Sequence, residues 1–210
     1  SRRQRQMCIR DRHILKATSE PDLIYTITVQ DHGKYPTELL ENPHIKVSGF
    51  APEDEERQNA FTYYVNQCHE TDAFLGSLIA TLNAFEEPVV LVLYGDHLPN
   101  LDITEEELAS GNLFQTEYVM WDNFGMEKKK VNLSAYQMAA EVMDRAGIHE
   151  GTIFRYHQAR RNTRNYQVDL ETLQYDLLYG EKYAYKDKEL TFERLSLIHI
   201  SEPTRHSLIS

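Results

Sequence analysis

The chain has 210 residues, with 22 Lys and Arg against 33 Asp and Glu and a formal net charge of −11. This balance argues against non-specific nucleic-acid binding, which depends on cationic contacts with phosphate, and we expect no nucleic-acid partner. No stretch is long and apolar enough to cross a bilayer.

Both ends of the sequence resemble translated sequencing adapters. The peptide Met7–Arg12 can be encoded by ATGTGTATAAGAGACAG, and the reverse complement of that DNA translates as the peptide Leu195–Ile200. Two ends of one protein have no biological reason to be related in this way. We therefore expect residues 1–12 and 195–210 to be adapter-like artefacts and exclude them from the fold. Cys68 is then the only native cysteine, which precludes an intrachain disulfide or a zinc site built from cysteines.

The first half of the remaining chain has a strand–helix–strand pattern. Residues 23–29 are β-branched and aromatic, which predicts a strand. A long helix is expected from about Asp54, with acidic residues in its first turn. Its predicted apolar face consists of Phe61, Tyr64, Val65, Cys68, Leu75, Leu78, Ile79 and Leu82. The apolar run 89–93 predicts a second strand, and a right-handed crossover would make the two strands parallel.

Candidate site residues follow both predicted strands. Gly95, Asp96 and His97 come directly after the second strand, and His32 follows the first. Gly95 is expected to let the chain turn where a side chain would obstruct it. If the strands are parallel, the three polar residues share one rim of the sheet, where ligands bind in open α/β folds. Asp96 and His97 could form half of a divalent-metal site, and the alternative is an Asp-His turn with no chemistry.

Shorter elements are expected in the second half. Residues 103–108 predict a short helix and residues 117–121 a strand. Ser134 and Gln137 form a capping-box pattern ahead of a helix that Gly147 can close. Further helices are expected at 151–163 and 170–178.

Three histidines lack any recognisable partner and are interpreted as surface residues without a role: His44, His149 and His157.

Several segments resemble the lipoteichoic acid synthase-like phosphoglycerol transferase branch of the alkaline phosphatase and sulfatase superfamily. Residues 94–99, Tyr-Gly-Asp-His-Leu-Pro, are similar to its metal-binding signature and are the most specific part. Residues 26–35 resemble its strand-then-histidine motif, and residues 64–82, 117–124 and 173–180 resemble later elements. The resemblance implies an α/β fold: part of a sulfatase-like sandwich with a mostly parallel central sheet flanked by helices. Residues 13–194 would be the C-terminal part of that catalytic domain.

The resemblance also implies a function and a site. Such enzymes are anchored in the bacterial cell membrane, face outward and transfer glycerol phosphate derived from a phospholipid, or act on related phosphodiesters or sulfate esters. Asp96 and His97 would be metal ligands and His32 would bind the substrate phosphate. The metal expected first is manganese, with magnesium, zinc and calcium as alternatives. The nucleophile would lie upstream, so the resemblance assigns no catalytic residue to this chain and implies a soluble, inactive fragment whose parent reaches the membrane through a missing N-terminal region.

Two other functions remain open at the level of sequence. One is a sulfatase-type hydrolase of the same superfamily. An upstream cysteine or serine nucleophile would favour this hydrolase, whereas an upstream threonine would favour the transferase. The other is a non-catalytic extracytoplasmic binding module that kept the sheet and lost the site.

Overall fold

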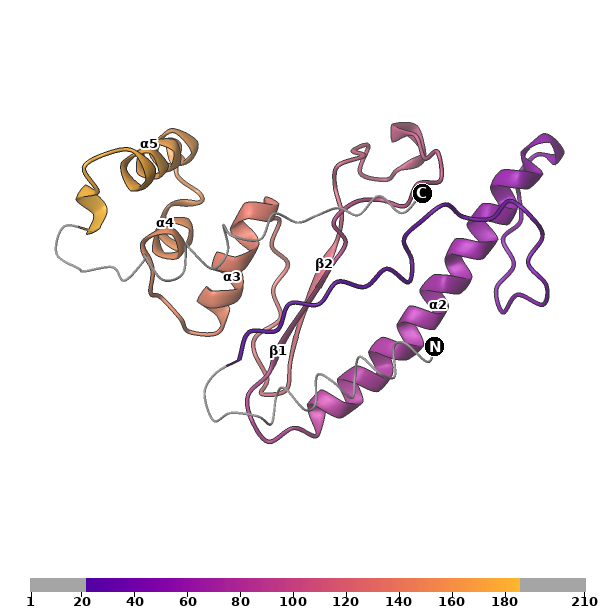
Figure 1. The fold of residues 1–210 in the computed structure, drawn as a ribbon, viewed down its shortest axis with the longest axis horizontal. Coiled ribbons are helices and arrows are strands. Elements are labelled where there is room, and N and C mark those ends of the chain that lie inside the picture. The colour runs from indigo at the N-terminus through magenta and orange to yellow at the C-terminus, as the bar shows by residue number, and fades with distance from the viewer. Residues whose placement is uncertain (1–21, 186–210) are drawn as a thin grey trace. The chain divides into compact units, whose positions relative to one another are not determined.

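The computed structural model describes residues 22–185, so both adapter-like ends lie outside the described residues. The chain divides into two compact units, one up to Glu127 and one from Lys128 (Figure 1). The described part is a mixed α/β structure with one small sheet and several helices. None of the helices in residues 22–185 combines the length and the apolar character needed to cross a membrane.

The longest element of the first unit is helix α2, Glu55–Asn83. A short 3₁₀ helix, η1 at Pro52–Asp54, leads into it, and its proline is compatible with a first helical turn. Asp54 occupies the N-cap position, and Glu55 and Glu56 place negative charge at the positive end of the helix dipole. The predicted start of this helix is confirmed.

The buried face of α2 differs from the predicted apolar face. Of the predicted residues only Leu82 is buried, and the others are half-buried. The other buried positions of the helix are Asn59, Ala60, Thr62 and Asn66. Polar residues are buried here because their side chains bind the backbone of an irregular segment. The Asn66 amide, for example, accepts from Ile45 N at 3.1 Å and donates to Ile45 O at 2.7 Å.

The sheet of the first unit consists of β1, Val90–Tyr94, and β2, Tyr118–Asp122. The strands are antiparallel, with Val90 opposite Asp122 and Tyr94 opposite Tyr118. Both strands were predicted to within one residue at each end. A short 3₁₀ helix, η2 at Glu105–Glu107, lies in the connection between them and stands where a short helix was expected.

The predicted mostly parallel sheet is wrong for the described residues. Residues 23–29 run in an extended line but pair with no strand, and the only sheet formed by residues 22–185 is the antiparallel β1–β2 pair. An alternating apolar pattern specifies a tendency to extend, whereas pairing requires a partner of suitable register elsewhere in the chain. The local conformation is therefore extended, while the ladder is missing.

Asn123, directly after β2, connects the end of α2 to the start of β1. Its side-chain oxygen accepts from Val89 N at 2.8 Å. Its amide nitrogen lies 3.3, 3.1 and 2.9 Å from the carbonyl oxygens of Leu82, Phe85 and Glu87. Because one side chain bonds to α2, to the residues that follow it and to the residue directly before β1, it fixes α2 relative to β1.

The second unit is helical. Its elements are η3 at Ala135–Gln137, α3 at Met138–Arg145, α4 at Thr152–Arg160, α5 at Tyr166–Leu178 and η4 at Tyr183–Tyr185. The predicted capping box is confirmed, with Ser134 N donating to Gln137 Oε1 at 3.0 Å. The buried residues include Ala140, Glu141 and Leu170.

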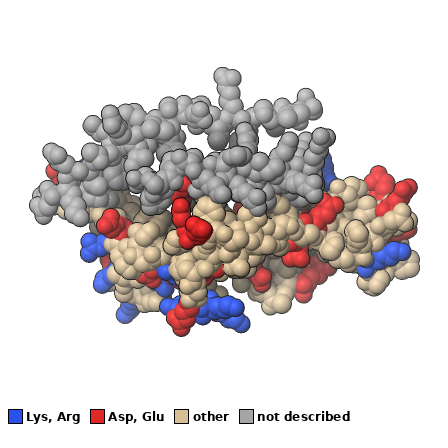
Figure 2. All heavy atoms as spheres, turned by 90° about the horizontal axis from the view of Figure 1, so that it is seen from below, with Lys and Arg blue, Asp and Glu red and all other residues tan. Residues whose placement is uncertain are grey.

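The charged side chains of the chain are mixed on the face shown in Figure 2, where Asp and Glu are spread among small groups of Lys and Arg.

Candidate functional site

The predicted metal-binding residues follow β1 on the surface. Thr116 Oγ1 donates to the Gly95 carbonyl at 2.7 Å, which ties the start of this turn to the residues preceding β2. Gly95 does not adopt a left-handed conformation, and a Cβ added to it would meet His97 O at 3.7 Å and Thr116 Cβ at 3.8 Å. These are ordinary contacts, so the expectation that a side chain would obstruct the turn at Gly95 is wrong.

His97 is arranged with one ring nitrogen available. Its Nδ1 lies 2.7 Å from the carbonyl oxygen of Leu98. A carbonyl oxygen can only accept, so Nδ1 carries the proton of the neutral ring and Nε2 carries the lone pair. Nε2 lies 3.7 Å from Asp96 Oδ1, and both side chains are exposed. A backbone carbonyl that fixes the tautomer in this way is a common support for histidines that bind metals.

His32 lies beside His97. The two rings have centroids 5.7 Å apart and meet edge to face at 73°. The hydroxyls of Tyr25 and Tyr94 lie 2.7 Å apart, so the segment before His32 also contacts the end of β1. The structure thus brings His32 and His97 together, while the metal-binding and phosphate-binding roles assigned to them stay predictions.

The donor set at this position suits part of a divalent-metal site. A carboxylate oxygen and an imidazole nitrogen 3.7 Å apart can contact one ion, since metal–ligand distances are about 2.0–2.2 Å. Within residues 22–185, no group of three or more His, Cys, Asp or Glu side chains is arranged to hold a metal. The geometry of Asp96 and His97 is thus compatible with two ligands of one cation.

The loop that carries His32 is supported by α2. Thr71 Oγ1 donates to Asp31 Oδ1 at 2.9 Å, and Tyr35 donates to the Asp31 carbonyl at 2.6 Å. Burial raises the pKa of Asp31, and the Thr71 hydrogen bond opposes that shift. Burial also raises the pKa of the Cys68 thiol, which lies half-buried on the same helix. These contacts were not predicted, because nothing in the local pattern of α2 links it to the loop.

His157 contradicts its interpretation as a surface residue. It is 5% exposed, and its Nδ1 lies 2.6 Å from the Tyr166 hydroxyl. Burial lowers the pKa of this histidine. No local pattern indicates burial at this position, because it depends on the packing of α4 against the start of α5.

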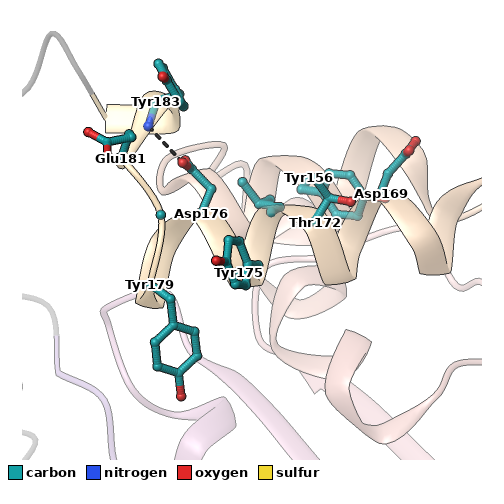
Figure 3. Close-up of a pocket in the computed structure, with 10 residues that line it drawn as sticks. Tyr156, Asp169, Thr172, Tyr175, Asp176, Tyr179, Glu181 and Tyr183 are labelled. Carbon is teal, nitrogen blue, oxygen red and sulfur yellow. Dashed lines mark hydrogen bonds between the residues drawn. The ribbon is translucent and has the colours of Figure 1, made fainter.

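The predicted site lies outside two hollows found on the surface of the described residues. A hollow of about 740 Å³ in the second unit is bordered by Tyr156, Tyr175, Tyr179, Tyr183, Asp169 and Asp176, among others (Figure 3). Two of its carboxylates have structural partners: Asp176 accepts from the backbone of Tyr183 at 3.1 Å, and Asp169 pairs with Arg160. A second hollow of about 640 Å³ lies between residues 39–47 and the start of α2.

Comparison with solved structures supports the fold. The chain is similar to the Streptococcus pyogenes phosphoglycerol transferase GacH, solved in complex with sn-glycerol-1-phosphate, with a TM-score of 0.53 and 23% identity. The match covers 70% of this chain and 44% of that chain. At this identity the likeness concerns the fold alone.

Comparison with sequences identifies the family of the chain. A protein of Rhizobium meliloti (strain 1021), provisionally named a cyclic beta-1,2-glucan modification protein, is 25% identical over 207 residues. The match covers 79% of this chain and 32% of that protein, so the chain spans about a third of the length of this relative. The family model described as Sulfatase matches residues 10–148, well over half of the chain. The resemblance to this superfamily is thereby confirmed, and the chain belongs to the sulfatase family.

Proposed function

We propose that this chain supplies part of the active site of a metal-dependent phosphoglycerol transferase. Asp96 and His97 bind the divalent cation, and His32 binds the phosphate of the substrate. The observation that carries the proposal is the arrangement after β1: two metal donors 3.7 Å apart and a second histidine ring 5.7 Å from the first. The fold shared with a transferase solved with glycerol phosphate supports this choice of substrate.

The residues of this chain have distinct tasks in such a site. His97 presents Nε2 because its Nδ1–H is held by Leu98 O, and Asp96 adds a negatively charged oxygen beside it. His32 can donate an N–H to a phosphate oxygen, more strongly when its ring is protonated. The bound cation would polarise a phosphoryl oxygen and lower the pKa of a coordinated hydroxyl.

The mixed donor set bears on the metal. Carboxylate donors suit manganese, magnesium and calcium, whereas imidazole donors suit zinc and other transition metals, so a mixed set is compatible with a transition-metal ion that also accepts oxygen ligands. We propose manganese as the resident ion. The nucleophile and the other ligands are proposed to belong to a preceding part of the parent protein, which acts at the extracytoplasmic face of a bacterial membrane.

Manganese and glycerol phosphate test the two roles separately. Substoichiometric Mn²⁺ should broaden the NMR signals of the His97 ring in the full chain, and Asp96→Ala should remove this effect. His32→Gln should keep the broadening but lose the shift changes that sn-glycerol-1-phosphate induces. The exposed His149 provides a control, because His149→Gln should change neither response. Equal broadening in the Asp96→Ala variant would contradict the metal site, and turnover of a phosphodiester by the chain alone would contradict the upstream nucleophile.

A sulfatase-type hydrolase is the second candidate, favoured by the description of the matching family. A sulfate ester and a glycerol phosphate present similar oxyanions, but a phosphate monoester carries more negative charge near neutral pH. Stronger competition by an aryl sulfate than by sn-glycerol-1-phosphate at His32 would favour the hydrolase.

A further inference from the structure

The backbone around His32 does little to fix this residue. Its N–H donates to the Val29 carbonyl at 3.3 Å, which closes a single turn. Gly33 follows with φ of 137°, a conformation that side chains disfavour. The preceding residues 23–29 are extended and form no ladder with the strands of the described chain. The position of His32 must therefore be set mainly by side-chain contacts.

Besides the contact between the Tyr25 and Tyr94 hydroxyls, three neighbouring side chains of α2 provide such contacts. Gln30 Nε2 donates to Gln67 Oε1 at 2.6 Å and to Glu70 Oε2 at 3.0 Å. Thr71 Oγ1 donates to Asp31 Oδ1 at 2.9 Å. Gln67, Glu70 and Thr71 are three and four positions apart, so they lie on one face of the helix. Both residues that precede His32 are thus bound to the same turn of α2.

The far end of the same helix is fixed to β1. The Asn123 side chain bonds to the carbonyls of Leu82 and Phe85 at the end of α2 and to Val89 N before β1. His97 follows β1 within the same unit. A continuous set of contacts therefore runs from Gln30 and Asp31 through α2 and Asn123 to β1, the strand that precedes His97.

We propose that Gln67 and Thr71 are positioning residues that hold His32 beside His97. Because residues 23–29 pair with no strand, contacts with α2 set the 5.7 Å separation of the His32 and His97 rings. Neither side chain has to touch substrate or metal for this role. The importance of the separation for activity rests on the proposed function, but the separation itself can be measured without it.

The test is a nuclear Overhauser effect between the ring protons of His32 and His97 in the full chain. We expect a cross-peak in the unsubstituted protein, and its loss in Thr71→Val and in the double variant Gln67→Ala/Thr71→Val. Thr71→Ser keeps the hydroxyl and should restore the cross-peak. Ser77→Ala is the matched control, because it removes a hydroxyl from the same helix that, among residues 22–185, bonds to Ala73 O of that helix.

The outcomes separate positioning from general loosening. Loss of the cross-peak with unchanged amide signals from β1 and β2 supports the proposal. A cross-peak that survives in the double variant, or is absent from the unsubstituted protein, overturns it. Loss of the cross-peak accompanied by changes in the amide signals throughout β1 and β2 also overturns the proposal, as does loss of the cross-peak in Ser77→Ala. No metal or substrate is present in this experiment, so failure to bind Mn²⁺ would count against the proposed function alone.

Discussion

At the scale of single residues, two glycines differ in how much space the structure leaves for a side chain. A Cβ at Gly180 would lie 2.8 Å from Asp176 Cα and 3.3 Å from its carbonyl oxygen, and neither backbone atom can move aside cheaply. At Gly95 the corresponding contacts are 3.7 Å or longer. Gly95, where the sequence analysis expected a side chain to obstruct the turn, therefore has more space for a side chain than Gly180.

We expect Gly180→Ala to lower the free energy of unfolding by about 1–3 kcal/mol, the usual cost of overpacking. Gly95→Ala should change it by no more than about 0.5 kcal/mol. Urea unfolding followed by circular dichroism measures both, and Trp121 in β2 gives a fluorescence signal for the unit that contains Gly95. A loss at Gly95 as large as that at Gly180 would show that the turn before Asp96 does require glycine.

His157 should make stability depend on pH. Burial lowers its pKa below the ordinary 6.5, so the unfolded chain binds this proton more readily than the folded chain. The free energy of unfolding should therefore decrease as the pH falls through 6.5, and level off below the folded-state pKa. Above 6.5 the residue is neutral in both states and contributes no pH dependence.

The measurement compares the unsubstituted protein with His157→Gln, which keeps a polar side chain near the Tyr166 hydroxyl. Urea unfolding between pH 7.5 and 5.5 should show a smaller loss of stability in the variant. The remaining histidines are common to both proteins and cancel in the difference. Identical pH dependence in the two proteins would mean that His157 does not titrate differently on folding.

At the scale of elements, two ion pairs of the helical unit should contribute very differently. Arg161, after α4, pairs with Glu141 of α3, whose side chain is only 3% exposed. Arg160 pairs with Asp169 of α5 at 3.4 Å, and these side chains are 52% and 40% exposed. Removing Arg161 leaves a buried carboxylate without its partner, whereas water can replace Arg160.

We expect Arg161→Ala to lower the free energy of unfolding by about 2–4 kcal/mol, somewhat less than for a pair buried on both sides. Arg160→Ala should cost at most about 1 kcal/mol. Thermal unfolding monitored at the helical circular dichroism band compares the two variants. If the double variant Glu141→Met/Arg161→Met is no more stable than Arg161→Ala, the uncompensated carboxylate is not the cause of the loss.

At the scale of the whole molecule, the sequence predicted those features that depend on residues close together in the chain. The start of α2 at Asp54, the capping box at Ser134 and both observed strands follow from local patterns. The pairing of β1 with β2 instead of with residues 23–29 does not, because register depends on distant partners. The burial of His157 escaped prediction for the same reason.

The candidate site was predicted in part. Gly95-Asp96-His97 was recognised from its sequence and its place after an apolar run, and His32 from its place after another. The two rings do lie together, although the parallel pairing used to predict this is absent among the described residues. The contacts from Gln67 and Thr71 could not be predicted, since glutamine and threonine on a helix usually indicate only a polar surface.

The extended segment before His32 has a consequence for handling the chain in solution. Leu23, Tyr25, Ile27 and Val29 are between 67% and 88% exposed, and they alternate along a backbone that forms no ladder with the rest of residues 22–185. Unpaired extended segments with apolar side chains recruit strands from other molecules. The chain expressed alone should therefore self-associate as its concentration rises.

Sedimentation velocity at increasing protein concentration measures this association. Replacing Ile27 and Val29 by threonine keeps the β propensity but removes apolar surface, so it should shift the distribution toward monomer. Thr28→Ser, on the intervening position, should leave the association unchanged. A concentration-independent monomer in the unsubstituted protein would contradict the expectation. If it holds, the unpaired segment that leads to His32 is also the surface that limits how concentrated a sample of this chain can be.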